Sequence, residues 1–119
     1  MNRAQTLKTK KEFAFVYKNS SKYRGDICDI CILKENLENV FNRKFRKNIN
    51  IKNSTFGLSV SKKIGIAVKR NYIKRQLRHI CQDLLKNKNI TLIIIVKNEI
   101  MRANFADIKN HIFNAIKFK

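Results

Sequence analysis

The hydrophobic pattern changes period twice between Thr55 and Val96, and this limits the fold more than any other feature of the chain. Thr55 to Lys62 alternates apolar with small residues, which is the period of a half-buried strand. From Val68 to Lys86 the apolar residues recur every three or four positions, which predicts an amphipathic helix. Ile90 to Val96 is almost wholly apolar and β-branched, as in a central strand buried on both faces. We therefore expect a strand, a helix and a second strand that share one core.

Weaker patterns predict elements on both sides of this block. Lys10 to Asn19 predicts a short helix, because its aromatic and aliphatic residues fall three and four positions apart. Asn104 followed by Asp107 is typical of a helix N-cap with an acidic first turn, and a final amphipathic helix is expected from Phe105 to Ile116. Tyr23 to Leu33 alternates in the manner of a strand. One face of that strand carries Cys28, Ile30 and Ile32, and the other carries Ile27, Asp29 and Cys31.

These elements predict a single α+β domain over residues 1–119, in the order α-β-β-β-α-β-α. The length fits one domain and leaves little room for a second. Residues 1–9 are expected to be a basic, flexible N-terminus. Residues 34–54 are polar and basic, and we interpret them as a long hairpin connection whose end enters the third strand.

The charge balance restricts the partners of this domain. Twenty-seven Lys and Arg residues face eight Asp and Glu residues, which gives a formal net charge of +19. A compact body with this imbalance repels itself unless it works against a polyanion. Nucleic acid is the first candidate and an anionic membrane surface the second. No apolar run is long enough for a transmembrane helix, and the polar start has no apolar segment of a signal peptide, so we expect a cytoplasmic protein.

The three cysteines do not predict a metal or redox site. Cys28-x-x-Cys31 has a spacing that can bind zinc or support redox chemistry. However, a second ligand pair is missing, and alternation turns the two sulfur atoms to opposite faces of the strand. We interpret both as ordinary buried strand cysteines, with no metal ligand among them.

The predicted central helix has a basic face that its apolar stripe does not explain. At ~100° per residue, Arg70, Lys74 and Arg78 share one sector, with Asn71 and Arg75 beside it. Like charges at this spacing destabilise an isolated helix, and cations near its N-terminus oppose the macrodipole. The face has the composition of a phosphate-binding surface. A solvated run of charge in a Lys-rich sequence is the alternative, and it stays open on composition alone.

Here the chain resembles a known family. The pattern K-x-G-x-A-V-x-R-N-x-x-K-R-x-x-R is met at Lys63, Gly65, Ala67, Val68, Arg70, Asn71, Lys74, Arg75 and Arg78. It is similar to the RNR signature of the bacterial ribonuclease P protein family. The stretch from Gly57 to Lys63 is also similar to that family's third strand, and Lys10 to Lys18 resembles its first helix. The resemblance covers the chain from about Leu7 onward.

The resemblance implies a ribosomal-protein-S5-domain-2-like sheet with a left-handed βαβ crossover, against the usual right-handed rule. It implies a non-catalytic protein subunit of a ribonucleoprotein endonuclease. In that enzyme a catalytic RNA uses Mg²⁺ to remove the 5′ leader of precursor tRNA, and the protein binds no cofactor stably. The RNR helix would bind the catalytic RNA through Lys62, Lys63, Arg70, Asn71, Lys74, Arg75 and Arg78. A cleft between the first helix and the sheet would hold the leader, with Phe13, Tyr17, Lys18, Ile27, Asp29 and Cys31 as its residues.

Some residues allow more than one interpretation. Phe13 and Tyr17, four apart on a short helix, have the spacing of core residues, but base stacking in the cleft is a competing use. Phe15 points elsewhere and is expected to pack. The eight carboxylates are scattered, and His79 and His111 have no acidic neighbour in sequence, so no catalytic residue and no metal site are expected.

Two other functions compete with the resemblance. A structural RNA-binding protein, such as a ribosomal protein, could use the same basic helix, but it needs positive charge and not this order of Gly, Ala and Asn. A membrane-surface or DNA-binding protein is the third possibility. The basic helix lacks large aromatics opposite its charges and has no dimer seam, so neither membrane nor DNA is an expected partner.

Overall fold

The computed structural model is an α+β domain built around one mixed sheet. It describes residues 5–34, 37, 41, 54–86, 88 and 90–117 of the 119. The elements, in chain order, are β1 (Gln5–Thr6), α1 (Lys10–Lys18), β2 (Ser20–Tyr23), β3 (Cys28–Leu33), β4 (Thr55–Ser59), the 3₁₀ turn η2 (Lys62–Ile64), α3 (Ala67–Leu84), β5 (Thr91–Val96), the 3₁₀ turn η3 (Asn98–Arg102) and α4 (Phe105–Lys117). After the two-residue β1, the order of helices and strands matches the predicted one, although β2 was not among the strands located in the sequence.

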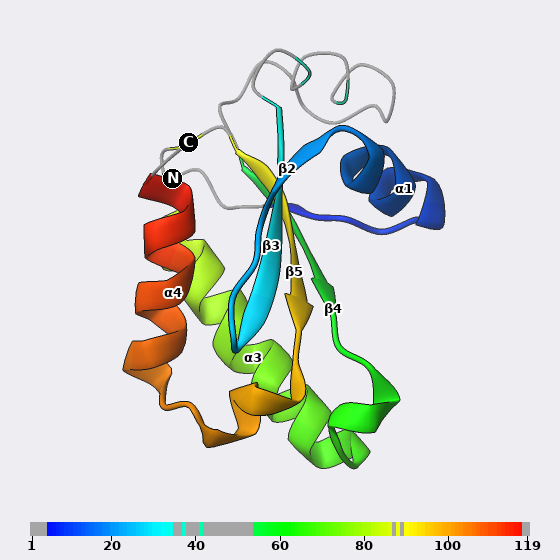
Figure 1. Cartoon of the computed structure of the whole chain (residues 1–119). Helices are drawn as coiled ribbons and strands as arrows, with labels where there is room; N and C mark the ends of the chain where they lie inside the picture. The colour runs from blue at the N-terminus through cyan, green and yellow to red at the C-terminus, as the bar shows by residue number, and fades with distance from the viewer. Residues whose placement is uncertain are drawn as a thin grey trace.

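The apolar strand β5 lies in the middle of the sheet, as its composition predicts. The strand order is β1-β4-β5-β3-β2. β5 runs parallel to β4, with Phe56 opposite Leu92, and antiparallel to β3, with Ile30 opposite Ile94. Helix α3 connects the parallel neighbours β4 and β5, so the predicted βαβ crossover is present (Figure 1). Its left-handed sense stays a prediction of the family resemblance.

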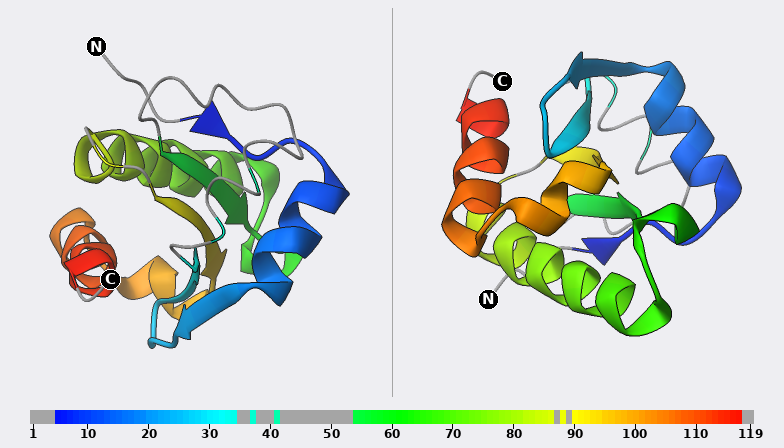
Figure 2. Two further views of the ribbon diagram at one scale, coloured as in Figure 1. Left: turned by 90° about the horizontal axis from the view of Figure 1, so that it is seen from above. Right: turned by 60° about the horizontal axis from the view of Figure 1, so that its bottom comes forward.

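Helices cover the two faces of the sheet unequally. α3 and α4 pack side by side on one face, whereas α1 lies against the other (Figures 1 and 2). Cys28, Ile30 and Ile32 belong to the large core cluster that includes residues of α3 and α4. Cys31 and Leu33 belong to a smaller cluster under α1. The alternation predicted for this strand is therefore confirmed from Cys28 onward, and Cys28 and Cys31 do lie on opposite faces.

Helices α1 and α4 each begin at a residue whose side chain caps the first turn. Thr9 caps α1, because its hydroxyl accepts a hydrogen bond from the Glu12 backbone N–H at 3.2 Å. Asn104 accepts one from the Asp107 backbone N–H at 2.8 Å and starts α4, as predicted. The helix expected from Val68 to Lys86 runs from Ala67 to Leu84, a shift of one or two residues at each end.

The single strand predicted from Tyr23 to Leu33 is wrong. β2 ends at Tyr23, a turn follows over residues 24–27, and β3 begins at Cys28 and pairs antiparallel with β2. A network closes this turn: the carboxylate of Asp29 accepts from the Gly25 N–H at 3.1 Å and lies 3.2 Å from the Lys97 ammonium group. That ammonium group also donates to the Gly25 carbonyl at 2.8 Å.

The predicted hairpin connection over 34–54 is also wrong in its topology. β3 and β4 are not neighbours, because the central strand β5 lies between them. Most of 34–54 lies outside the described residues, although Phe41 is fully buried and packs against Phe15 with ring centroids 5.8 Å apart. Phe15 therefore packs, as expected.

The N-terminal stretch is more structured than expected. Gln5 and Thr6 form β1, parallel to β4, and Leu7 is buried under α1. Residues 1–4 of the expected flexible segment lie outside the described part. No helix in the described part of the chain is long and apolar enough to cross a membrane.

Candidate nucleic-acid interface

The start of α3 is held by a backbone turn that only glycine adopts readily. Ser61 caps η2 by accepting from the Lys63 N–H at 3.2 Å, and Gly65 follows with φ at 154°. The guanidinium group of Arg70 then donates back to the Gly65 carbonyl at 3.0 Å. Arg70 thus ties the first turns of α3 to η2, in addition to any contact with a ligand.

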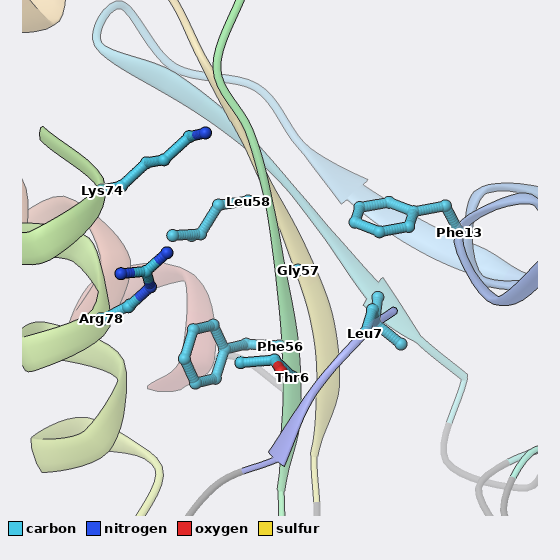
Figure 3. A pocket seen from close by; sticks show the side chains of 8 residues that line it. All are labelled: Thr6, Leu7, Phe13, Phe56, Gly57, Leu58, Lys74 and Arg78. Atoms are coloured by element: carbon cyan, nitrogen blue, oxygen red, sulfur yellow. The ribbon is translucent and has the colours of Figure 1, made fainter. Parts of the chain in front are cut away.

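The basic and apolar faces of α3 are separated in space, as the helical periodicity predicts. Ile73 and Leu77 are buried in the large cluster. Asn71, Arg75 and Arg78 are exposed, and so are Lys62 and Lys63 of η2. Lys74 is half-buried, and its side chain extends from α3 toward β4 (Figure 3). The structure therefore gathers all seven predicted RNA-binding residues on α3 and the turn that precedes it.

A hollow of about 360 Å³ lies at the edge of β4, between α1 and α3. Figure 3 shows Phe13 on one side of β4 and the side chains of Lys74 and Arg78 on the other, with Gly57 in the strand between them. A second hollow of about 580 Å³ continues toward the start of α1 and shares Phe13 and Lys74. We call the two hollows together the basic groove. Its polar and aromatic lining includes Lys8, Lys10, Phe13, Tyr17, Ser59, Lys74 and Arg78.

The groove exists because the edge of β4 is only partly covered. β1 pairs with β4 as far as Phe56, whose carbonyl accepts from the Leu7 N–H at 2.9 Å. Beyond that point the residues that face α1 are small, namely Gly57 and Ser59. A Cβ atom on Gly57 would come within 2.8 Å of the Phe13 ring, so this ring packs directly against the strand backbone.

Phe13 and Tyr17 form one wall of the groove. Both are half-buried, and their ring centroids are 6.3 Å apart. The Tyr17 hydroxyl hydrogen bonds with Ser59, and burial raises the pKa of this phenol above its ordinary value. The aromatic pair therefore contacts the core with one side and lines the groove with the other, and base stacking stays a prediction.

The other residues predicted for the leader cleft do not all join this wall. Lys18 is exposed at the end of α1. Cys31 is 1% exposed, because α1 covers it, and burial raises the pKa of its thiol. Ile27 packs against the large cluster on the opposite face, because it lies in the turn where strand alternation has not yet begun. Asp29 is engaged in the turn network with Lys97. The assignment of Ile27 to the cleft face is therefore wrong, and Cys31 lies beneath the surface.

Several residues of the groove were missed by sequence reasoning, among them Lys8, Lys10, Leu58 and Ser59. The floor of the basic groove could have been predicted from the sequence of β4. The residues of β4 on the face away from the large core, Gly57 and Ser59, are too small to fill the space beside an aromatic helix face. Lys8 and Lys10 had no such signal, since only the pairing of β1 with β4 brings them here.

The described residues do not offer a protein metal centre. Within the described ranges, no three His, Cys, Asp or Glu side chains lie close enough to hold one ion. Asp29 is paired with Lys97, and Asp83 lies 2.6 Å from the ammonium group of Lys109. Burial raises the pKa of Cys28 and of Cys81 to about 12, so these thiols stay protonated and are poor ligands and nucleophiles.

Comparisons with known proteins agree with the fold and with the family resemblance. The family model described as Ribonuclease P matches residues 1–118. The ribonuclease P protein component of Helicobacter hepaticus is 34% identical, over 94% of this chain and 82% of its own length. That of Streptococcus pneumoniae serotype 4 is 29% identical, over 93% and 80%.

Solved structures show the same fold at lower identity. The RNase P protein of Staphylococcus aureus superposes with a TM-score of 0.74 at 23% identity, over 98% of this chain and 95% of that one. The RNase P protein of Thermotoga maritima gives a TM-score of 0.70 at 19% identity, over 97% of both chains. The sequence matches, which extend over almost the whole chain, carry the assignment of function. The chain belongs to the ribonuclease P protein family and is a subunit of that tRNA-processing enzyme.

Proposed function

We propose that this chain is a non-catalytic subunit that binds the catalytic RNA through α3 and the 5′ leader of precursor tRNA through the basic groove. In this proposal the RNA cleaves the phosphodiester bond with Mg²⁺, and the complex acts in the cytoplasm. The observation that carries the proposal is the position of Lys74. It belongs to the basic face of α3 and also lines both hollows beside Phe13, so one continuous surface serves two RNA segments.

The exposed side of α3 suits an RNA backbone. Arg75 and Arg78 project from the helix beside Asn71, and Lys62 and Lys63 extend the row onto η2. Each phosphate that such a cation neutralises releases condensed counterions, which is the main source of affinity for nucleic acid. Arg70 is anchored to Gly65, so its charge is held in place before binding.

The basic groove suits a single strand better than a duplex. Phe13 and Tyr17 offer partly exposed rings on which unpaired bases can stack, and each stacked base contributes roughly 1–3 kcal/mol. Lys8, Lys10 and Lys74 surround these rings and can neutralise the phosphates between successive bases. The leader of precursor tRNA is the single-stranded segment that the family resemblance implies.

The chemistry is assigned to the RNA because the described carboxylates do not fit a magnesium site. A protein nuclease that uses metal ions needs clustered carboxylates to hold them. Here Asp29 and Asp83 are each paired with a lysine, and within the described residues no three His, Cys, Asp or Glu side chains lie close enough to hold an ion. Magnesium ions are therefore proposed to be bound by the RNA and its substrate.

Reconstitution tests this division of labour. Nuclease-free protein without RNA should not cleave precursor tRNA at any Mg²⁺ concentration. Adding the protein to its catalytic RNA should allow cleavage at a lower Mg²⁺ concentration than the RNA requires alone. Mg²⁺-dependent cleavage by the purified protein without RNA would refute the proposal.

A further inference from the structure

A further hollow beside α3, separate from the two of the basic groove, is apolar and has no role in the function proposed above. It measures about 590 Å³ and lies between α3, η3 and the first turn of α4. The described residues include six large apolar side chains that are exposed, and four of them line this hollow: Val68, Tyr72, Met101 and Phe105. We call it the apolar hollow. Such a concentration of exposed apolar groups on a highly charged protein marks a binding site.

The aromatic walls of the apolar hollow are held in position. The Tyr72 hydroxyl accepts a hydrogen bond from the Gln76 side-chain amide at 3.1 Å. The Phe105 ring lies 6.0 Å from the ring of His79, centroid to centroid. Ile73 and Ile100, both buried, close the floor. A preformed cavity of this kind binds a flat apolar group without first paying to order its walls.

The charges around the apolar hollow select its occupant. Lys69 is the only charged residue in the described lining, and no acidic residue lines it. Asn71 and Arg75 lie on the exposed side of α3, between the apolar hollow and the basic groove, and we call this side the crest of α3. A second copy of this chain, with its net charge of +19, would bring a like-charged helix against this one. A nucleobase attached to a phosphate backbone instead matches both the apolar walls and the cationic rim.

We infer that the apolar hollow receives an unpaired base of the catalytic RNA, whose phosphates lie along the crest of α3. The inference rests on the proposed function, since it takes α3 to be the helix that contacts this RNA. It adds base stacking to the electrostatic contacts that are proposed between α3 and the catalytic RNA. One side of α3 then faces the leader groove, and the other holds the catalytic RNA.

The salt dependence of RNA binding distinguishes base stacking in the apolar hollow from phosphate contacts on α3. We would measure the dissociation constant of the full-length protein for its full-length catalytic RNA over a range of salt concentrations. Tyr72→Ala should weaken binding about tenfold at every salt concentration and leave the salt slope unchanged, because stacking releases no counterions. Tyr72→Phe keeps the ring and should recover most of the affinity. Phe113→Ala is the matched control, because Phe113 is a similarly exposed aromatic on α4 outside the hollow, and it should bind like the unmodified protein.

Met101→Ser is a second variant of the hollow, placed on η3 so that it leaves α3 intact. It should weaken binding in the same salt-independent way. If Tyr72→Ala and Met101→Ser bind normally while Arg75→Ala binds more weakly, the inference is wrong and the proposed function stands. If Arg75→Ala also binds normally at all salt concentrations, the RNA contact of α3 fails as well. If Tyr72→Ala instead converts a dimer of the free protein to a monomer in sedimentation, the occupant is a second copy and the inference is overturned.

Discussion

The two faces of the sheet differ in how completely helices cover them. On one face, α3 and α4 cover the strands with a large cluster of aliphatic side chains, and the residues of β3, β4 and β5 that point there are nearly all buried. On the other face, α1 alone covers a small cluster, and the edge of β4 beyond Phe56 is left open. Most of the buried core therefore lies on the two-helix face. The two-helix face holds the fold together, and incomplete cover on the one-helix face leaves a groove.

The largest expected effect is on the two-helix face. Leu77 is fully buried in the large cluster, so Leu77→Ala should lower the free energy of unfolding by about 2–5 kcal/mol. Phe13→Ala should lower the free energy of unfolding by clearly less, because the ring is only half-buried in a small cluster. Urea denaturation of the two variants measures the difference. Equal losses would show that Phe13 is a core residue and that the faces do not differ as described.

The next effect concerns binding on the one-helix face. Phe13→Ala should weaken the binding of precursor tRNA to the reconstituted complex by roughly 1–3 kcal/mol, since one stacking platform is lost. Mature tRNA, which has no leader, should bind almost as before. Equilibrium binding of the two RNAs to the variant and unmodified complexes gives the comparison. A loss of the same size for mature tRNA would point to general distortion of α1.

A smaller effect is expected on the charged crest of α3. Arg75 is exposed and has no hydrogen-bond or ion-pair role in the described structure, so Arg75→Ala should change RNA binding without changing stability. The slope of log K against log salt concentration should become shallower by about 0.7–0.9, the value for one phosphate contact. Arg70→Ala is the contrasting variant. It should reduce the slope and also lower the melting temperature, because Arg70 holds the Gly65 carbonyl.

The smallest effect is expected at the turn between β2 and β3. Burial alone would raise the pKa of Asp29, but hydrogen bonds from Gly25 and Lys97 outweigh it and hold this pKa below its ordinary value. A carboxylate with a lowered pKa in the folded state stabilises the protein above the unfolded pKa and loses this contribution as the pH falls through the folded one. Asp29→Asn should therefore lower the free energy of unfolding by about 0.5–1 kcal/mol at neutral pH.

Unfolding experiments at a series of pH values check the sign of this effect. The difference in free energy of unfolding between Asp29→Asn and the unmodified protein should shrink as the pH falls below the ordinary pKa of an aspartate, ~4. A difference that is constant with pH would mean that the turn depends on the shape of the side chain and not on its charge.

Periodicity predicted the elements that bury a continuous face. The helix α3 and the strand β5 were located to within two residues because their apolar residues repeat over many positions. β2 was missed because Ser20–Tyr23 is a short, polar edge strand that pairs with β3 alone and buries little. The alternation of β3 was extended back to Ile27, where the chain is already in a turn, and this put Ile27 on the wrong face.

The basic face of α3 could be predicted, but the shape of the groove could not. Arg70, Lys74 and Arg78 share a sector because helix geometry is local. The groove instead depends on β1 pairing with β4 across some fifty positions of sequence, which no local pattern encodes. Cys31 illustrates the same limit: alternation gave its face correctly, whereas its burial depends on where α1 docks.

Site-directed crosslinking tests most directly whether the leader lies in the basic groove. The three native cysteines are all buried, so a cysteine placed at an exposed position can be labelled selectively. Ala14 is exposed on α1 and lines the groove, whereas Ala106 is exposed on α4, which packs on the other face of the sheet. The variants Ala14→Cys and Ala106→Cys, each carrying the same photocrosslinker, form a matched pair.

Both labelled variants would be assembled with the catalytic RNA and irradiated with precursor tRNA. We expect crosslinks from position 14 to leader nucleotides, and none to the leader from position 106. Leader crosslinks of equal yield from both positions, or crosslinks from position 14 confined to the body of the tRNA, would contradict the placement of the leader in the basic groove.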